Sequence, residues 1–127
     1  MATILIIEDT PEILENLAEF MELEGYKVIV AENGRKGIKL AREYRPDLII
    51  CDVLMAEMDG HEVLRLLLDD AKTNEIPFIF STSMSEKIEK SEALKLGADD
   101  YIIKPFELES LLAMAKSWIK SGSKRTT

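Results

Sequence analysis

The stretch DLIICDVLMAEMDG, residues 47–60, contains the pattern that decides the fold. Its apolar run, residues 48–51, is continuous rather than alternating, and the acidic residue Asp52 follows it directly. A short apolar run without polar alternation is typical of a strand covered on both faces, as in a parallel sheet. Four similar runs occur elsewhere in the chain, at residues 4–7, 28–30, 78–80 and 101–103.

Segments with helical spacing of apolar residues separate these runs. After the first run, Ile13, Leu17 and Met21 recur at four-residue steps, Thr10 is a candidate cap, and Gly25 ends the segment. We expect further helices over residues 35–44, 60–69, 86–96 and 107–120. Strand and helix thus alternate five times, which predicts a doubly wound α/β fold: a parallel sheet between two layers of helices.

Length and composition favour one domain, which we place at residues 1–120, with a polar tail or linker stub at 121–127. No apolar run is long enough for a membrane span, and the first residues lack the basic segment of a secretory signal, so we expect a cytoplasmic protein without membrane contact. A single cysteine excludes a disulfide framework. The net charge of −8 argues against direct nucleic-acid binding.

Polar residues follow four of the five apolar runs. Glu8 and Asp9 follow the first, Asp52 the third, Thr82 the fourth and Lys104 the fifth. Because the carboxyl ends of parallel strands meet at one edge of a sheet, we expect these side chains to lie together.

This set of residues predicts a metal-assisted phosphoryl site. Three clustered carboxylates repel one another unless a cation neutralises them, and hard oxygen ligands favour Mg²⁺. Lys104 would add a positive charge and Thr82 a hydrogen bond to phosphoryl oxygens. A carboxylate can itself act as the nucleophile and become an aspartyl phosphate.

At these residues the chain resembles the receiver domains of two-component response regulators, over essentially residues 3–120. The motifs that carry the resemblance are Glu8-Asp9, Asp52, Met55, Met58-Asp59-Gly60, Pro77 leading into Thr82, Gly97-Ala98-Asp99-Asp100-Tyr101 and Lys104-Pro105-Phe106. The resemblance implies a five-stranded sheet of order 2-1-3-4-5 with five helices, and a cis bond between Lys104 and Pro105.

The resemblance also implies a role for each site residue. Asp52 would be the phosphoacceptor, and Mg²⁺ would be bound by Asp9 and Asp52, by Glu8 through water and by the backbone carbonyl of Leu54. The remaining roles concern the response to the phosphoryl group: Thr82 and Lys104 would hold its oxygens, and Tyr101 would be the aromatic switch residue.

The partners that the resemblance implies are a histidine kinase or histidine phosphotransfer protein upstream and a downstream protein or output domain. The surface over residues 86–120, made by the fourth helix, fifth strand and fifth helix, would change on phosphorylation, and homodimerisation through the last two helices is an open possibility. The protein would be no enzyme beyond Mg²⁺-dependent self-phosphorylation from small donors and slow autodephosphorylation.

Four positions qualify the resemblance. Ala56 stands where the family usually has proline, and Ser83 where it commonly has alanine; neither change removes a ligand. Leu54 and Met84 would border the phosphoryl group, and both are apolar. Apolar neighbours cannot orient an attacking water, so we expect slow loss of the phosphoryl group.

Other interpretations stay open or fit less well. A flavodoxin-like FMN binder would need a Ser/Thr/Gly-rich loop after the first strand, and a haloacid-dehalogenase-like phosphatase a second acid two residues after its nucleophile; the chain has neither. A phosphate-independent interaction domain is the remaining alternative. We expect no metal or phosphorelay role for His61, and we assign Cys51 and Trp118 to the core.

Overall fold

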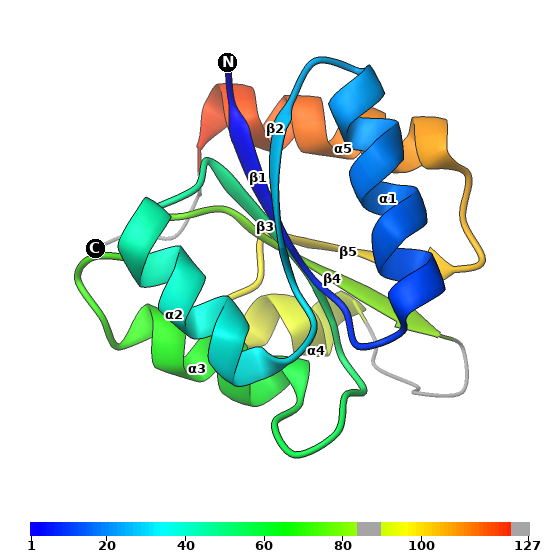
Figure 1. Ribbon diagram of the computed structural model, residues 1–127. Helices are drawn as coiled ribbons and strands as arrows, with labels where there is room; N and C mark the ends of the chain where they lie inside the picture. Colours follow the sequence, from blue (N-terminus) through cyan, green and yellow to red (C-terminus); the bar gives the residue numbers. More distant parts are fainter. Residues whose placement is uncertain (84–89, 123–127) are drawn as a thin grey trace.

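The computed structural model describes residues 1–83 and 90–122, and it is a three-layer α/β sandwich (Figure 1). Its sheet has the strand order β2-β1-β3-β4-β5, and every pairing is parallel. The strands are β1 (Thr3–Ile7), β2 (Lys27–Ala31), β3 (Leu48–Asp52), β4 (Phe78–Ser83) and β5 (Asp100–Lys104). The helices are α1 (Pro11–Leu23), α2 (Gly34–Tyr44), α3 (Gly60–Leu68), α4 (Lys90–Lys95) and α5 (Leu108–Ser121). The predicted fold class and strand order are confirmed.

Two hydrophobic clusters fill the space between the layers. Helices α1 and α5 pack on one face of the sheet, where Leu17 and Leu111 meet alternate side chains of the strands, such as Ile6. Helices α2, α3 and α4 cover the other face, where Leu64 and Phe80 belong to the second cluster. Both faces of the central strands are therefore buried, as the continuous apolar runs predict.

The two edge strands differ from the three central ones. Strands β1, β3 and β4 are almost entirely buried, whereas β2 and β5 carry exposed apolar residues, with Val30 40% and Ile103 41% exposed. An apolar run alone does not tell a central strand from an edge strand. The expectation of cover on both faces is therefore correct for the centre and too strong for the edges.

Side-chain caps begin two of the helices. Asn33 caps α2 and Asp59 caps α3 through side-chain hydrogen bonds to backbone N–H groups. Thr10 holds the cap position of α1, but its side chain makes no cap hydrogen bond; instead, its N–H donates to Glu8 Oε2 at 3.1 Å. The predicted fourth helix is described only as α4, because residues 86–89 lie outside the described part of the chain.

Two aspartates of the Gly97–Tyr101 motif fix β5 in place. The buried carboxylate of Asp99 accepts the N–H of Phe78 at 2.9 Å, and Asp99 returns its own N–H to the Phe78 carbonyl. Asp100 accepts both the N–H of Tyr101 and the indole N–H of Trp118, each at 2.9 Å. Trp118 packs on the core as expected, and its hydrogen bond also joins α5 to β5.

Candidate functional site

The carboxyl ends of the strands bring the predicted residues together. Glu8 follows β1, Asp52 ends β3 and Lys104 ends β5, while Thr82 lies near the end of β4. The register pairs Ile7 with Cys51, so the next residues, Glu8 and Asp52, leave neighbouring strands side by side. Parallel topology thus builds one site from residues far apart in sequence.

Glu8, Asp9 and Asp52 form an acidic group whose ligand oxygens all lie within 4.8 Å of one another. Glu8 and Asp52 are buried, with 2% and 5% of their surface exposed, whereas Asp9 is exposed. Three hard oxygen donors with one open side match the preference of Mg²⁺, which takes few carboxylates and keeps several waters. The donor set therefore fits the predicted metal.

Lys104 supplies the positive charge among these carboxylates. Its ammonium donates to Glu8 Oε1 at 2.8 Å and to Asp52 Oδ1 at 3.1 Å. Burial by itself lowers the pKa of Lys104, but the hydrogen bond to Glu8 and the charge of Asp52 outweigh it and raise the pKa above its ordinary value. Lys104 is therefore a permanent cation at neutral pH, held between two acids.

The other predicted residues surround this centre at different depths. Thr82 is 1% exposed, and its hydroxyl donates to the Ser83 carbonyl at 3.3 Å. Tyr101 pairs in register with Phe80 and packs half-buried against the cluster under α2, α3 and α4. Met84, which we expect to border the phosphoryl group with Leu54, lies outside the described residues.

The loop after Asp52 folds back over the acidic group. The N–H of Ala56 donates to Asp9 Oδ2 at 3.3 Å, and Leu54 is 65% exposed. Glu57 has a φ of 67° at the centre of a three-residue turn, closed by the hydrogen bond from Met58 N–H to Ala56 at 2.7 Å. The turn holds the loop without the family's usual proline.

Gly60 fixes how closely α3 approaches the site. Its N–H donates to the Val53 carbonyl at 2.7 Å, and a Cβ there would meet the carbonyl oxygen of Asp52 and lie 3.0 Å from Val53 Cα. Only glycine fits such a close approach of two backbones. The Met58-Asp59-Gly60 motif therefore places the start of α3 against the acceptor strand.

Lys104–Pro105 is a cis peptide bond, as predicted. Cys51 is fully buried, and burial together with the negative charge of Asp52 raises the pKa of its thiol well above the usual range. The thiol stays protonated and acts as a small core side chain, in agreement with the sequence interpretation.

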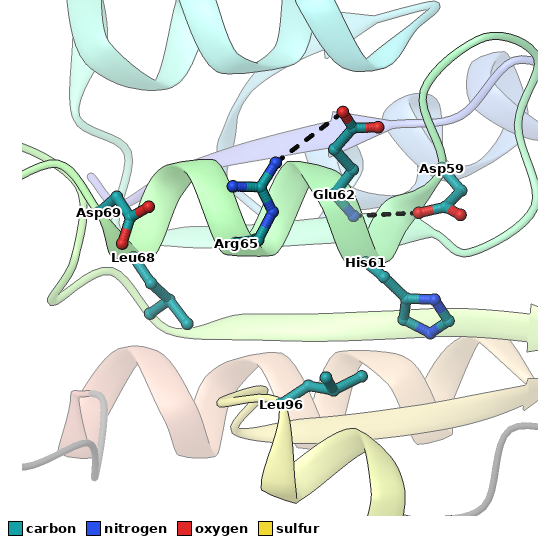
Figure 2. A pocket seen from close by; sticks show the side chains of 7 residues that line it. All are labelled: Asp59, His61, Glu62, Arg65, Leu68, Asp69 and Leu96. Atoms are coloured by element: carbon teal, nitrogen blue, oxygen red, sulfur yellow. Dashed lines mark hydrogen bonds and ion pairs between the residues drawn. The ribbon is translucent and has the colours of Figure 1, made fainter.

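A pocket of about 470 Å³ lies between α3 and the end of α4, and none of its lining residues belongs to the acidic group (Figure 2). His61 and Leu68 extend from α3 toward Leu96, and Glu62 pairs with Arg65 at 4.0 Å. His61 packs edge-on against Phe80, with ring centroids 5.3 Å apart. This contact supports a packing role for the histidine and gives no sign of metal binding.

The model of the response regulator receiver domain matches residues 4–116 of this chain. The chain belongs to this family. Receiver domains are phosphoacceptors rather than conventional enzymes, and they act as switches in two-component phosphorelays, where they work with histidine kinases. In the described part of this receiver domain, no helix is long and apolar enough to cross a membrane.

Curated relatives of this receiver domain differ in length. Protein PilH of Pseudomonas aeruginosa is 38% identical over 112 residues, which are 88% of this chain and 93% of PilH. Several transcriptional regulators also match, but this chain spans only about half of their length. Some members of the family thus carry an output region beside the receiver domain.

Solved structures agree with the fold. A signal receiver domain of a histidine kinase from Syntrophus aciditrophicus is 38% identical and has a TM-score of 0.87. The match covers 100% of this chain and 96% of the solved chain. The receiver domain of sensor histidine kinase PA1611 from Pseudomonas aeruginosa PAO1 is 26% identical, with a TM-score of 0.81, and the match covers 94% of this chain and 98% of the PA1611 domain. The PA1611 domain was solved with a magnesium ion coordinated in its active site cleft.

Proposed function

We propose that this receiver domain accepts a phosphoryl group on Asp52 from a phosphohistidine of a histidine kinase or a histidine phosphotransfer protein. A carboxylate oxygen of Asp52 attacks phosphorus, the bond between phosphorus and the donor's imidazole nitrogen breaks, and the imidazole leaves. Glu8 and Asp9 lie beside the acceptor and are not modified in the transfer. The proposal makes the chain a phosphorylation-dependent switch.

The contact of Lys104 with Asp52 is the observation that carries this proposal. The ammonium lies 3.1 Å from Asp52 Oδ1, so it would be within reach of the oxygens of a phosphoryl group attached to that carboxylate. Thr82 lies near the end of the neighbouring strand β4 and would donate its hydroxyl to another phosphoryl oxygen. A half-buried cation beside the acceptor carboxylate suits a group that arrives with more negative charge.

Glu8, Asp9 and Asp52 would hold Mg²⁺, with the backbone carbonyl of Leu54 as a further ligand. When bound, the ion would neutralise the negative charge that the carboxylates and the phosphoryl group bring together. The related PA1611 domain, with its coordinated magnesium, supports this assignment.

The response would run from Thr82 to Tyr101. Tyr101 lies in β5, the strand that pairs with the strand of Thr82. If Thr82 moves toward the phosphoryl group, space would open for the ring of Tyr101. The surface over residues 86–120 would then change its preference for a downstream protein or output domain, by a shift between two existing states. We assign the switch to residues 1–120 and a tail to 121–127; a cytoplasmic location and homodimer formation stay predictions.

Intact mass spectrometry tests the acceptor. The protein is incubated with acetyl phosphate and Mg²⁺, beside Asp52→Asn and beside a sample with EDTA. One phosphoryl adduct that needs Mg²⁺ and is absent from the variant is the expected result. If neither acetyl phosphate nor a panel of histidine kinases gives an adduct, the phosphate-independent interaction domain becomes the better interpretation.

A further inference from the structure

A groove of about 410 Å³ runs between α1 and the edge strand β2, on the side of the molecule away from β5. Its floor is apolar and consists of Leu14, Ala18, Val28 and Val30. Val30 is 40% exposed, whereas the apolar residues of the central strands are buried. The groove thus leaves apolar surface uncovered at an edge where strand pairing ends.

Three glutamates of α1, Glu15, Glu19 and Glu22, line the same groove and are exposed. They lie three and four residues apart, so they are neighbours on one flank of the helix and repel one another. Helix α1 contains no basic residue, and within residues 1–83 and 90–122 none of the three has an ion-pair partner.

The position of these acids works against the helix itself. Glu22 lies in the last turn of α1, where the helix dipole favours a positive charge, and no basic residue offsets it. The stability of α1 therefore does not explain why three glutamates lie along this flank of the helix. Charges that cost helix stability beside an exposed apolar floor are suited to binding a surface of opposite charge.

We propose that the groove between α1 and β2 binds an amphipathic helix of another protein, with basic residues along one edge and apolar residues toward Val28 and Val30. From Glu15 to Glu22 the helix rises roughly 10 Å, about two turns. A partner helix lying along α1 would match this row with lysines or arginines at the same spacing. Charge complementarity selects this occupant over a second copy, which would bring the same acids, and over nucleic acid or an anionic membrane.

Such a partner would leave the phosphoryl site accessible. The opposite flank of α1, with Ile13 and Asn16, faces Lys104 and Pro105. The groove lies at the β2 edge, and β5 lies at the other end of the sheet. A protein bound in the groove could therefore hold the receiver domain while a phosphodonor approaches Asp52.

A designed peptide tests the groove. The probe is a helix of about 18 residues made of lysine, leucine and alanine, long enough to be helical, with lysines at positions i, i+4 and i+7 along one edge. Its affinity for the full chain is measured by fluorescence polarisation, and its site is mapped by ¹H–¹⁵N NMR. A peptide with glutamate in place of lysine is the charge control.

The variant Glu15→Gln/Glu19→Gln/Glu22→Gln is compared with Glu43→Gln/Glu75→Gln/Glu109→Gln. Both remove three exposed acids and change the net charge from −8 to −5, because each substitution removes one negative charge. We expect the α1 variant to bind at least about tenfold more weakly, because three charge pairs are lost together, and the matched variant to bind within about twofold of the native chain. Native NMR shifts should cluster on α1 and β2.

Val30→Ser tests the apolar floor and should also weaken binding. Equal losses in the two triple variants, or NMR shifts spread over other helices, would overturn the proposal, because general attraction to an acidic protein would then explain binding. A dimer of the native chain in sedimentation that the α1 variant abolishes would assign the groove to a second copy instead. Urea unfolding checks the fold, and the α1 variant should be at least as stable as the native chain.

Discussion

Replacing Lys104 with methionine gives the sharpest test of the site, because one ammonium contacts two buried acids. The side chains of Glu8 and Asp52 are 3% and 6% exposed, and Lys104 lies 2.8 and 3.1 Å from them. Methionine keeps much of the length of lysine and removes both the charge and the hydrogen bonds. The two carboxylates would then face each other without the cation between them.

The expected loss follows from the burial of the acids. Removing one partner of a buried ion pair typically costs about 3–5 kcal/mol, because the remaining charge is left without compensation. Lys104 keeps 19% of its side chain exposed, and water on that side lowers the cost. We therefore expect Lys104→Met to reduce the free energy of unfolding by about 3 kcal/mol at neutral pH without divalent cations.

The pH dependence of this loss has a definite sign. The pKa of Lys104 is raised in the folded chain, because its partners outweigh the effect of burial, from an unfolded value near 10.5. The stabilisation is therefore fully present below pH 10.5 and is lost as the pH rises through the higher folded pKa. The difference in unfolding free energy between the native chain and the variant should stay constant from neutral pH to about pH 10.5 and shrink above it.

Urea unfolding followed by the fluorescence of Trp118, the sole tryptophan, measures the effect. Lys39→Met, an exposed lysine of α2, is the control and should change stability by less than about 0.5 kcal/mol. Added Mg²⁺ should narrow the gap, because a second cation can replace the lost charge. A loss below about 1 kcal/mol, or a gap that Mg²⁺ leaves unchanged, would refute the argument that Lys104 balances this acidic group.

Three further predictions concern residues around the acceptor. Gly60→Ala should destabilise the fold by about 1–3 kcal/mol and slow phosphorylation, because its methyl meets the Asp52 carbonyl; unchanged unfolding and labelling would show that the loop can yield. Glu57→Gly should raise the unfolding free energy by roughly 0.5–1 kcal/mol, since φ is 67° there, and a lower midpoint in urea would contradict this. Leu54→Asn with Met84→Glu should speed loss of the phosphoryl group in a mass-spectrometric time course, and an unchanged rate would exclude the proposed screening of water.

Most of the architecture could be predicted because its signals are local. Continuous apolar runs and four-residue spacing identify strands and helices, and their alternation determines the layers. The difference between central and edge strands could not be predicted from the runs alone, since Val28-Ile29-Val30 looks as apolar as a central strand. The exposure of Val30 depends on where the strand lies in the sheet, which is a property of topology.

The site could be predicted as a set of residues but not as a set of contacts. Polar residues after strands predict which side chains meet. The sequence does not show that the ammonium of Lys104 contacts both Glu8 and Asp52; only the structure does. The sequence did not predict that Asp100 accepts hydrogen bonds from the backbone N–H of Tyr101 and the indole N–H of Trp118. An aspartate in a strand with a tryptophan on the following helix was the available signal, but many spacings would produce the same pattern.

The hydrogen bond from Lys104 to Glu8 joins residues 96 positions apart, which sets the order of events while the chain is being made. Synthesis at about 5–20 residues per second delivers the lysine roughly 5–20 s after the glutamate. During the second half of that interval, after Asp52 has been made, the growing chain carries its acceptor aspartate but lacks the cation beside it. A nascent or truncated copy would therefore be silent in signalling, and competence would arrive only when the last strand closes the sheet.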